Sequence, residues 1–210
     1  MIISEKKDGP MNGKKNKDIF LKKHGSAGNN LILGEQVHGK NIEIVGKSQR
    51  GETIRSTDGL ISGRESFFIG VTVADCIPIS FFSKEVSGIL HVGWRGLERG
   101  IIEEALQKIV LMGERVEKVF FEIGPSIGPC HFEVGDDVVE RFKGYEKFLY
   151  REKGKKFLDI KNIAGQKLKN GGVKNLMISD KCTYCNPERY YSFRRDKKLK
   201  SMLALNYPLK

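Results

Sequence analysis

The stretch FFIGVTVADCIPISFF, residues 67–82, is the longest apolar run in the chain. A glycine, an aspartate and a proline interrupt it, and it falls short of the roughly 18–20 apolar residues that span a membrane. Short runs rich in Val, Ile and Phe are typical of buried strands. The stretch therefore predicts two strands, Phe67–Val73 and Ile77–Phe82, with Asp75 and Cys76 between them.

Similar apolar runs on both sides of this stretch predict further strands. These are Leu31–Leu33, Ile42–Val45, Gly59–Ser62, Gly88–Trp94, Val119–Ile123, Asn175–Ser179 and Met202–Asn206. An apolar stripe of helical period over Ile101–Val110 predicts a helix, and residues 136–143 and 159–169 predict two more. Several strands follow one another without an intervening helix, which favours mixed sheets over a purely parallel sheet.

The composition indicates one globular α/β domain. Hydrophobic residues make up 39% of the 210 residues and aromatic residues 9%, which excludes wholesale disorder. Residues 1–24 hold seven lysines and three acids and are expected to form a flexible basic segment, with a single α/β catalytic domain over residues 25–210. No apolar leader follows Met1, and four cysteines do not make a secreted disulfide framework at this length. We therefore expect a cytoplasmic protein that does not associate with membranes.

The formal net charge of +11 is concentrated near the end of the chain. Residues 141–210 hold 19 basic and six acidic groups. Such a segment can attract nucleic acid or another polyanion. Its lysines are not interleaved with aromatic residues, however, and no RNA-binding signature is present. We expect a solvated lysine-rich face and no nucleic-acid partner, with a non-enzymatic polyanion-binding protein as an alternative.

Three segments place a histidine or a cysteine at the end of an expected strand. They are Gln36-Val37-His38-Gly39, Ala74-Asp75-Cys76-Ile77-Pro78 and His91-Val92-Gly93-Trp94-Arg95-Gly96. Two His and one Cys can bind Zn²⁺ and leave a fourth position for water, which is the arrangement of a catalytic zinc. The long spacings form no local motif. The residues alone therefore also allow structural histidines, a core cysteine, or a Cys76 nucleophile with His91 as its base.

A second pattern competes with this one. His131-Phe132-Glu133 and Cys182-Thr183-Tyr184-Cys185 together resemble the H-x-E and C-x-x-C of zinc nucleobase deaminases. Lys181, not proline, precedes the first cysteine, and the interval from His131 to Cys182 is long. A structural zinc would need two more ligands, and the chain has no second C-x-x-C to supply them. Two reduced thiols near a strand end are the simpler interpretation.

Seven segments in order resemble the multicopper polyphenol oxidoreductase (laccase-like) family, whose members are also described as purine nucleoside phosphorylases and as the peptidoglycan editing factor PgeF. Besides the three segments with His38, Cys76 and His91, they are Thr57-Asp58-Gly59-Leu60-Ile61-Ser62, Ile123-Gly124-Pro125-Ser126-Ile127-Gly128, Cys182-Thr183 and Tyr191-Ser192-Phe193-Arg194-Arg195-Asp196. Seven segments in the same order are not expected by chance. The match runs from about Gly34 to Asp196.

The resemblance implies a four-layer α/β/β/α sandwich with mixed sheets. It implies one Zn²⁺ held by His38, Cys76 and His91, which would also be the catalytic residues. Copper is the alternative metal, because copper-dependent polyphenol oxidation was proposed for the family. The implied reactions are phosphorolysis of adenosine, inosine and 5′-methylthioadenosine, and deamination of adenosine. Purine nucleosides and phosphate would then be the partners, and we expect a monomer.

Three residues are candidates for substrate binding. Arg95 and Arg194 are candidates for phosphate or ribose contacts, because a guanidinium binds phosphate bidentately. Ser126 lies in a Gly/Pro loop that can present backbone N–H groups to an anion. Arg194 and Arg195 are expected to alternate on a strand and so to have different roles. Lys197-Lys198-Leu199-Lys200 replaces a Gly-containing turn of the family, so a phosphate contact there is expected to be lost or moved to a lysine.

Another class of enzyme stays open beside the phosphorylase. Cys76 with His91 would suit an amidase or a cell-wall editing hydrolase with a cysteine nucleophile. Metal content separates the two readings, because a thiol nucleophile works without zinc.

Overall fold

The computed structural model describes residues 1–26, 30–63 and 66–206. Its strands form two large sheets and a hairpin. The five-stranded sheet has the order β1 (Ile2–Ile3), β13 (Met202–Leu205), β6 (Phe68–Val73), β2 (Leu31–Gly34), β4 (Thr53–Ile54). The six-stranded sheet has the order β12 (Asn175–Ile178), β9 (Phe120–Ile123), β7 (Ile77–Phe82), β8 (Ser87–Val92), β5 (Gly59–Ser62), β3 (Ile42–Ile44). Both sheets combine parallel and antiparallel pairs, which confirms the expected mixed sheets.

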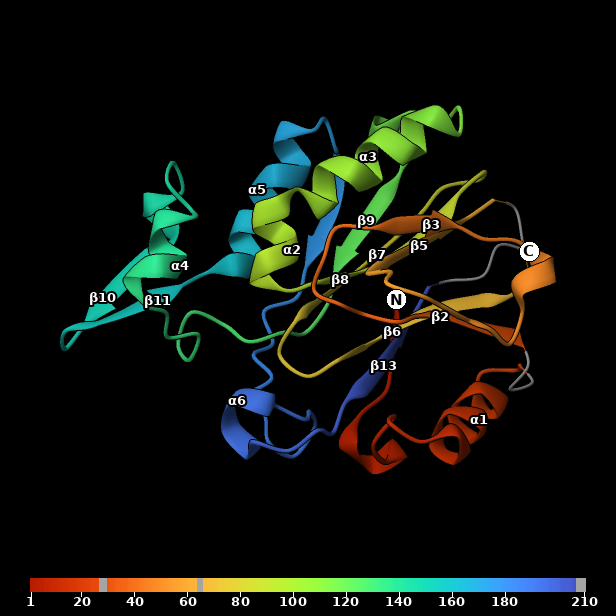
Figure 1. Ribbon diagram of the computed structural model, residues 1–210, viewed down its shortest axis with the longest axis horizontal. Helices are drawn as coiled ribbons and strands as arrows, with labels where there is room; N and C mark the ends of the chain where they lie inside the picture. The colour runs from red at the N-terminus through yellow and green to blue at the C-terminus, as the bar shows by residue number, and fades with distance from the viewer. Residues whose placement is uncertain (27–29, 64–65, 207–210) are drawn as a thin grey trace.

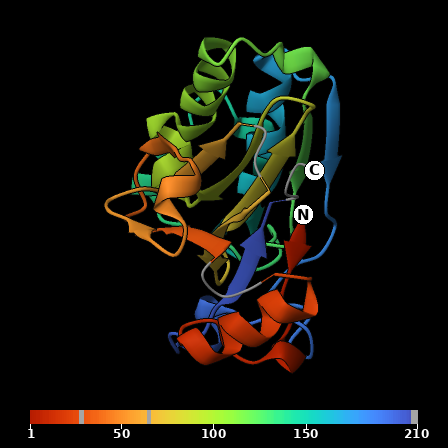
Figure 2. The ribbon, with the colours of Figure 1, turned by 90° about the vertical axis from the view of Figure 1, so that its right-hand side faces the viewer.

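Helices cover the outer faces of the two sheets. The α-helices are α1 (Lys14–Lys23), α2 (Trp94–Arg99), α3 (Ile101–Leu111), α4 (Asp136–Glu140), α5 (Ile160–Asn170) and α6 (Phe193–Asp196). Short 3₁₀ turns are η1 (Lys6–Asp8), η3 (Lys47–Gln49), η4 (Val116–Lys118) and η5 (Glu146–Phe148), and the hairpin consists of β10 (Leu149–Glu152) and β11 (Lys155–Leu158). Helices α2, α3 and α5 lie on one side of the molecule and α1 on the other (Figures 1 and 2). This arrangement confirms the α/β/β/α sandwich.

Alternation along the strands explains why the sandwich has three apolar layers. Leu60 packs between the two sheets, whereas its neighbour Ile61 packs toward α2, α3 and α5. On β6, Ile69 faces the space between the sheets and Phe68 faces α1. Successive strand residues point to opposite faces, and here both faces of each central strand are covered. The central strands are therefore apolar at nearly every position.

The first 24 residues contain ordered elements. Strand β1 pairs with β13, and Phe20 and Leu21 of α1 are buried against the five-stranded sheet. The flexible segment expected over residues 1–24 therefore packs on the domain, because two adjacent apolar residues among its lysines give it a buried face.

Some helices and strands differ from those predicted from the sequence, or were not predicted. The strand expected over Gly88–Trp94 ends at Val92, and Trp94 begins α2. Strands of two residues such as β4, and helices as short as α6, carry too few residues to show a period. No helix in residues 1–26, 30–63 and 66–206 has both the length and the apolar character that crossing a bilayer requires.

One glycine is required by the packing of the six-stranded sheet. Gly88 on β8 lies opposite Phe81 on β7, and the Phe81 ring stacks on Phe121 of β9 with 5.1 Å between ring centroids. A Cβ atom added to Gly88 would lie 2.0 Å from Cζ of Phe81. The ring therefore occupies the space that any side chain at position 88 would need.

Gly88→Ala is expected to lower the free energy of unfolding by about 1–3 kcal/mol, because overpacking forces the Phe81 ring from its place. Chemical denaturation monitored by circular dichroism measures this. Gly46→Ala is the matched control, because Gly46 has a φ of −132° and open space around its Cβ position. Equal midpoints for the two variants would contradict this account of Gly88.

Candidate active site

The sheets bring one cysteine and two histidines from distant parts of the chain together. His38 lies between β2 and β3, Cys76 lies in the turn between β6 and β7, and His91 lies in β8. The β7–β8 register pairs Pro78 with His91, which brings His91 close to the turn that carries Cys76. The ligand atoms of the three residues lie within 4.8 Å of one another. This cluster can hold a metal ion.

A glycine leaves room for the cluster. Gly93 directly follows β8, and a Cβ atom there would lie 3.0 Å from Cδ2 of His38 and 3.3 Å from Sγ of Cys76. A side chain at position 93 would therefore crowd both residues. Thiolate and imidazole are preferred ligands of Zn²⁺, so the donor set and the space around it fit a zinc ion.

The buried carboxylate of Asp58 positions two of the three ligands. It accepts hydrogen bonds from the backbone N–H groups of Val37, His38 and Gly39, at 3.2, 3.0 and 2.7 Å. These bonds hold His38 in the left-handed region, with a φ of 59°. Nδ1 of His91 lies 2.8 Å from the same carboxylate. Because a carboxylate only accepts, Nδ1 carries the proton and Nε2 is the nitrogen with a lone pair for a metal.

Without a metal, the cluster forms a thiolate–imidazolium pair. Burial raises the pKa of the Cys76 thiol, but the charge of His91 and hydrogen bonds with His38 and His91 outweigh it and lower the pKa to about 6. Burial lowers the pKa of His91, but Cys76 and Asp58 outweigh it and raise the pKa to about 9. Burial also opposes ionisation of Asp58, yet hydrogen bonds from His91 and Gly39 hold its pKa below the usual value. The thiolate is the form that binds a metal or attacks a substrate.

A second carboxylate ties the end of the chain to the Cys76 turn. Oδ1 of Asp75 accepts a hydrogen bond of 2.6 Å from the Thr183 hydroxyl. Its Oδ2 accepts bonds from the Ser192 hydroxyl at 3.0 Å and the Arg194 backbone N–H at 2.7 Å. Asp75 itself has a φ of 86°, an unusual conformation for a residue other than glycine. These bonds fix Thr183, Ser192 and Arg194 to the turn that carries Cys76.

The cluster lies in a cavity of about 520 Å³. Its apolar wall includes Ile127, Phe132 and Phe193, and its basic side chains come from Arg194, Lys198 and Lys200. The complete lining is Asn12, Gly34, Gln36, His38, Thr72, Ala74, Asp75, Cys76, His91, Ile127, Phe132, Phe193, Arg194, Lys198, Leu199, Lys200 and Ser201. Gln36 and Asp75 were not assigned to the site from the sequence, because nothing in their local pattern sets them apart from turn residues. Lys198 and Lys200 belong to the segment where a phosphate contact was expected to be lost or moved to a lysine.

The three candidate substrate-binding residues lie in different places. Arg194 lines the cavity, and its Nη1 donates to the carbonyl of Glu133 at 3.0 Å. Arg95 does not line it, and its guanidinium lies 4.4 Å from the centre of the Trp94 ring. Ser126 is fully buried behind the cavity wall, and its hydroxyl has no hydrogen-bond partner among the residues that the structure describes.

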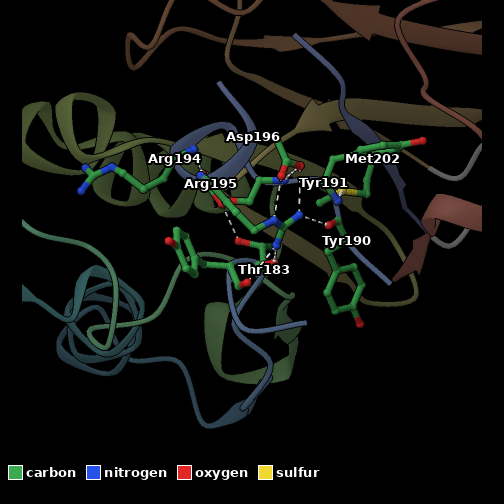
Figure 3. Close-up of polar contacts among 10 residues, drawn as sticks. Thr183, Tyr190, Tyr191, Arg194, Arg195, Asp196 and Met202 are labelled. Atoms are coloured by element: carbon green, nitrogen blue, oxygen red, sulfur yellow. Dashed lines mark hydrogen bonds and ion pairs between the residues drawn. The ribbon is translucent and has the colours of Figure 1, made fainter. Parts of the chain in front are cut away.

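Arg194 and Arg195 lie in helix α6 rather than on the expected strand, because the Ser192 side chain caps a helical turn there. Their side chains nevertheless diverge (Figure 3). The Arg195 guanidinium donates to the backbone carbonyls of Thr183, Tyr184 and Tyr190, each at 2.8 Å, and pairs with Asp196. Arg195 is therefore an internal brace of this segment and not an exposed residue.

The histidine of the H-x-E and the two cysteines of the C-x-x-C also lie close together, and Cys130 lies beside them. The ligand atoms of His131, Cys182 and Cys185 lie within 4.8 Å of one another and of Cys130. No second C-x-x-C is present in the sequence, but the adjacent residues Cys130 and His131 bring two further ligand-type atoms to Cys182 and Cys185. The carboxylate of Glu133 instead pairs with Lys155 at 2.9 Å.

Comparisons with known proteins agree with this architecture. The family model for multi-copper polyphenol oxidoreductase laccase matches residues 3–205. The purine nucleoside phosphorylase of Aquifex aeolicus is 38% identical over 147 residues, which are 70% of this chain and 68% of that protein. The purine nucleoside phosphorylase YfiH of Escherichia coli is 34% identical over 170 residues, with coverage of 78% and 68%. The crystal structure of YlmD from Geobacillus stearothermophilus is 28% identical, covers 94% of this chain and 80% of its own, and gives a TM-score of 0.85.

Asp58→Asn is expected to weaken metal binding at the cluster about 10- to 100-fold, because His91 loses its charged partner. Zinc competition with a chromophoric chelator measures this, on a Cys182→Ser/Cys185→Ser background so that only one cluster is titrated. Asp180→Asn is the control, since Asp180 is exposed and forms its ion pair with its neighbour Lys181. An unchanged zinc affinity in Asp58→Asn would show that Asp58 does not position the metal ligands.

Arg195→Ala is expected to destabilise the protein by about 1.5–3 kcal/mol or more, because three carbonyls lose a charged donor. Arg189→Ala should cost less than about 1 kcal/mol, since Arg189 forms a half-exposed ion pair with Glu5. Thermal or urea denaturation of the two variants compares an internal arginine with a surface one. Similar small losses for both would show that the bonds of Arg195 contribute little.

Proposed function

The chain belongs to the multi-copper polyphenol oxidoreductase laccase family, and from that premise we propose that it is a zinc-dependent purine nucleoside phosphorylase that also deaminates adenosine. The observation that carries the proposal is the cavity, which combines a Cys/His cluster with aromatic and basic walls. The names of the relatives from Aquifex aeolicus and Escherichia coli supply the class of substrate. Adenosine, inosine and 5′-methylthioadenosine are the proposed nucleosides.

His38, Cys76 and His91 are the proposed zinc ligands and catalytic residues. The donor set, the room beside Gly93 and the Nδ1–H bond of His91 to Asp58 support this assignment. When bound there, zinc supplies a Lewis acid that polarises an oxygen nucleophile. With three protein ligands, a bound zinc would keep a position for water or substrate, as in catalytic zinc sites.

The basic residues of the cavity are proposed to bind phosphate. Arg194, Lys198 and Lys200 line the same cavity. Among the described residues that line it, the carboxylate is that of Asp75, which already accepts three hydrogen bonds. An anion is therefore attracted to this wall. Lys198 and Lys200 belong to the segment that replaces the expected Gly-containing turn, so a lysine can take over a phosphate contact there.

The aromatic residues are proposed to receive the purine. Phe132 and Phe193 line the cavity, and Phe193 is 49% exposed, so its ring is open to a ligand. A purine that stacks on an aromatic ring is bound without regard to its exocyclic groups. This fits a site that accepts both adenosine and inosine. Trp94 has the Arg95 guanidinium over its ring and does not line the cavity.

The two proposed reactions differ in the nucleophile. In phosphorolysis, a phosphate oxygen forms a bond to C1′ of the ribose while the bond from C1′ to the purine nitrogen breaks. The purine leaves with a proton, and ribose 1-phosphate forms. In deamination, water adds to C6 of adenosine and ammonia leaves. Only the first reaction consumes phosphate, so the phosphate-binding wall is needed for one reaction and not for the other.

A cysteine-dependent hydrolase is the second candidate, because one arrangement favours it. Cys76 contacts His91, and Asp58 holds His91 through Nδ1 at 2.8 Å. A nucleophile, a base and a group that orients the base are the parts of a thiol hydrolase. The proposed substrate is an amide, as in an amidase or a cell-wall editing enzyme. Such an enzyme needs no metal, which separates it from the phosphorylase.

Adenosine incubated with the protein is expected to give adenine and ribose 1-phosphate only with phosphate, and inosine with or without it. Chromatography of the products with varied phosphate measures both rates. Arg194→Ala should raise the KM for phosphate about ten- to a hundredfold, the value of one charge-assisted contact, and slow deamination much less. Arg95→Ala is the matched comparison, because Arg95 lies outside the cavity.

Removal of the metal by a chelator should abolish both reactions, and readdition of Zn²⁺ should restore them. Equal losses of phosphorolysis and deamination in Arg194→Ala would assign this residue a structural role through its bond to the Glu133 carbonyl. If the protein converts none of the nucleosides, and cleaves an amide after treatment with a chelator, it is the hydrolase instead.

A further inference from the structure

We propose that Cys130, His131, Cys182 and Cys185 form a second zinc site, with a structural role and no part in the proposed reaction. Sγ of Cys130 lies 3.6 Å from Sγ of Cys182 and 3.4 Å from Sγ of Cys185. Sγ of Cys185 lies 3.3 Å from Nδ1 of His131. All four ligand atoms lie within 4.8 Å of one another, and none belongs to the cluster of His38, Cys76 and His91.

The spacing of these atoms fits a tetrahedral metal ion. With Zn–S bonds of about 2.3 Å and a Zn–N bond of about 2.0–2.1 Å, two sulfurs of a tetrahedral site lie about 3.8 Å apart, and a sulfur and a nitrogen about 3.6 Å. Three of the six separations, at 3.3–3.6 Å, are slightly shorter than these edges, and the other three are at most 4.8 Å. Small movements of the side chains are therefore enough to admit the ion.

The backbone around the cluster holds two loops together. Ser126 and Cys182 form a parallel bridge, and the Thr183 N–H donates to the Ser126 carbonyl at 3.0 Å. The Gly128 N–H donates to Sγ of Cys182 at 3.2 Å, a bond that stabilises a thiolate ligand. A Cβ atom at Gly128 would lie 3.3 Å from Sγ of Cys130, so glycine leaves space for the sulfur. The site is therefore preformed by the fold.

A buried lysine balances the charge. Three thiolates and one Zn²⁺ carry a net charge of −1, and a neutral imidazole does not change it. Lys161 is 6% exposed and lines the same hollow as Cys130 and Cys182. Its ammonium donates to the carbonyls of Ser179 and Lys181, at 3.0 and 2.8 Å, which keeps it in this hollow. Burial of a charge is costly without opposite charge nearby. The carboxylates of Asp159 and Asp180 line this hollow too, and the metal–thiolate site would add a further negative charge beside Lys161.

The arrangement favours a structural ion over the two other chemistries that cysteines and histidine offer. Four protein ligands leave no coordination position for water, unlike a deaminase site. The Glu133 carboxylate that would transfer protons is paired with Lys155. A disulfide would use two sulfurs and leave the third sulfur and His131 unexplained at the same point.

The site joins a loop that lines the cavity to a loop that is bonded to the cavity residue Asp75. The loop with Cys130 and His131 also carries Ile127 and Phe132, which line that cavity. The loop with Cys182 and Cys185 carries Thr183, which donates to Asp75 beside Cys76. A metal that ties the loops together therefore keeps the cavity wall in place without contacting the substrate.

Metal analysis of three proteins tests the proposal independently of any activity. Purified wild type is expected to hold two Zn²⁺ per chain. His38→Ala/His91→Ala and Cys182→Ser/Cys185→Ser should each hold one. X-ray absorption of the zinc retained by His38→Ala/His91→Ala should show three sulfur ligands and one nitrogen ligand. That measurement leaves the four ligands intact, so it stands even if the cysteine variant fails to fold.

A stability measurement gives the role of the ion. A chelator should lower the melting temperature of His38→Ala/His91→Ala, and Zn²⁺ should restore it. Cys76→Ser is the control, because it removes a thiol outside this cluster. Its melting temperature should still fall with the chelator and recover with Zn²⁺. Absence of zinc from His38→Ala/His91→Ala, or a disulfide between two of the three cysteines in protein purified under reducing conditions, would overturn the proposal.

Discussion

The buried carboxylate of Asp58 is the contact on which the rest of the site depends. It is fully buried, and a buried charge is stable only when hydrogen bonds and opposite charges surround it. Three consecutive N–H groups of the His38 loop and the ring of His91 meet this need. One carboxylate thus sets the conformation of a loop and the tautomer of a histidine, and no other described group contacts both in this way.

The Cys76 turn stands between two such carboxylates. Asp58 fixes the histidines on one side, and Asp75 fixes Thr183, Ser192 and Arg194 on the other. The site therefore draws on segments from four parts of the chain, and each is tied by hydrogen bonds rather than by apolar contacts alone. Rigid support of this kind is what a catalytic metal or a nucleophilic thiol requires.

The two Cys/His clusters differ in composition, and the difference suggests separate roles. The cluster of His38, Cys76 and His91 offers three ligands and opens into the cavity, as a catalytic ion requires. The cluster around Cys182 offers four ligands, three of them sulfur, as a structural ion prefers. Cys182 is followed directly by Thr183, whose hydroxyl reaches Asp75, so the two clusters are coupled through one short segment.

The apolar runs by themselves predicted the strands and the mixed sheets, because such runs are local features, and the resemblance of the ordered motifs to the family pointed to His38, Cys76 and His91 as candidate ligands. Only the tertiary structure decided which residues surround them. Cys130 is a lone cysteine in the sequence, and it meets Cys182 because a bridge joins loops 52 residues apart. Arg195 is an internal brace because its guanidinium donates to the carbonyls of Thr183 and Tyr190, which lie in other turns. Such contacts depend on sheet register and loop closure, which no local pattern encodes.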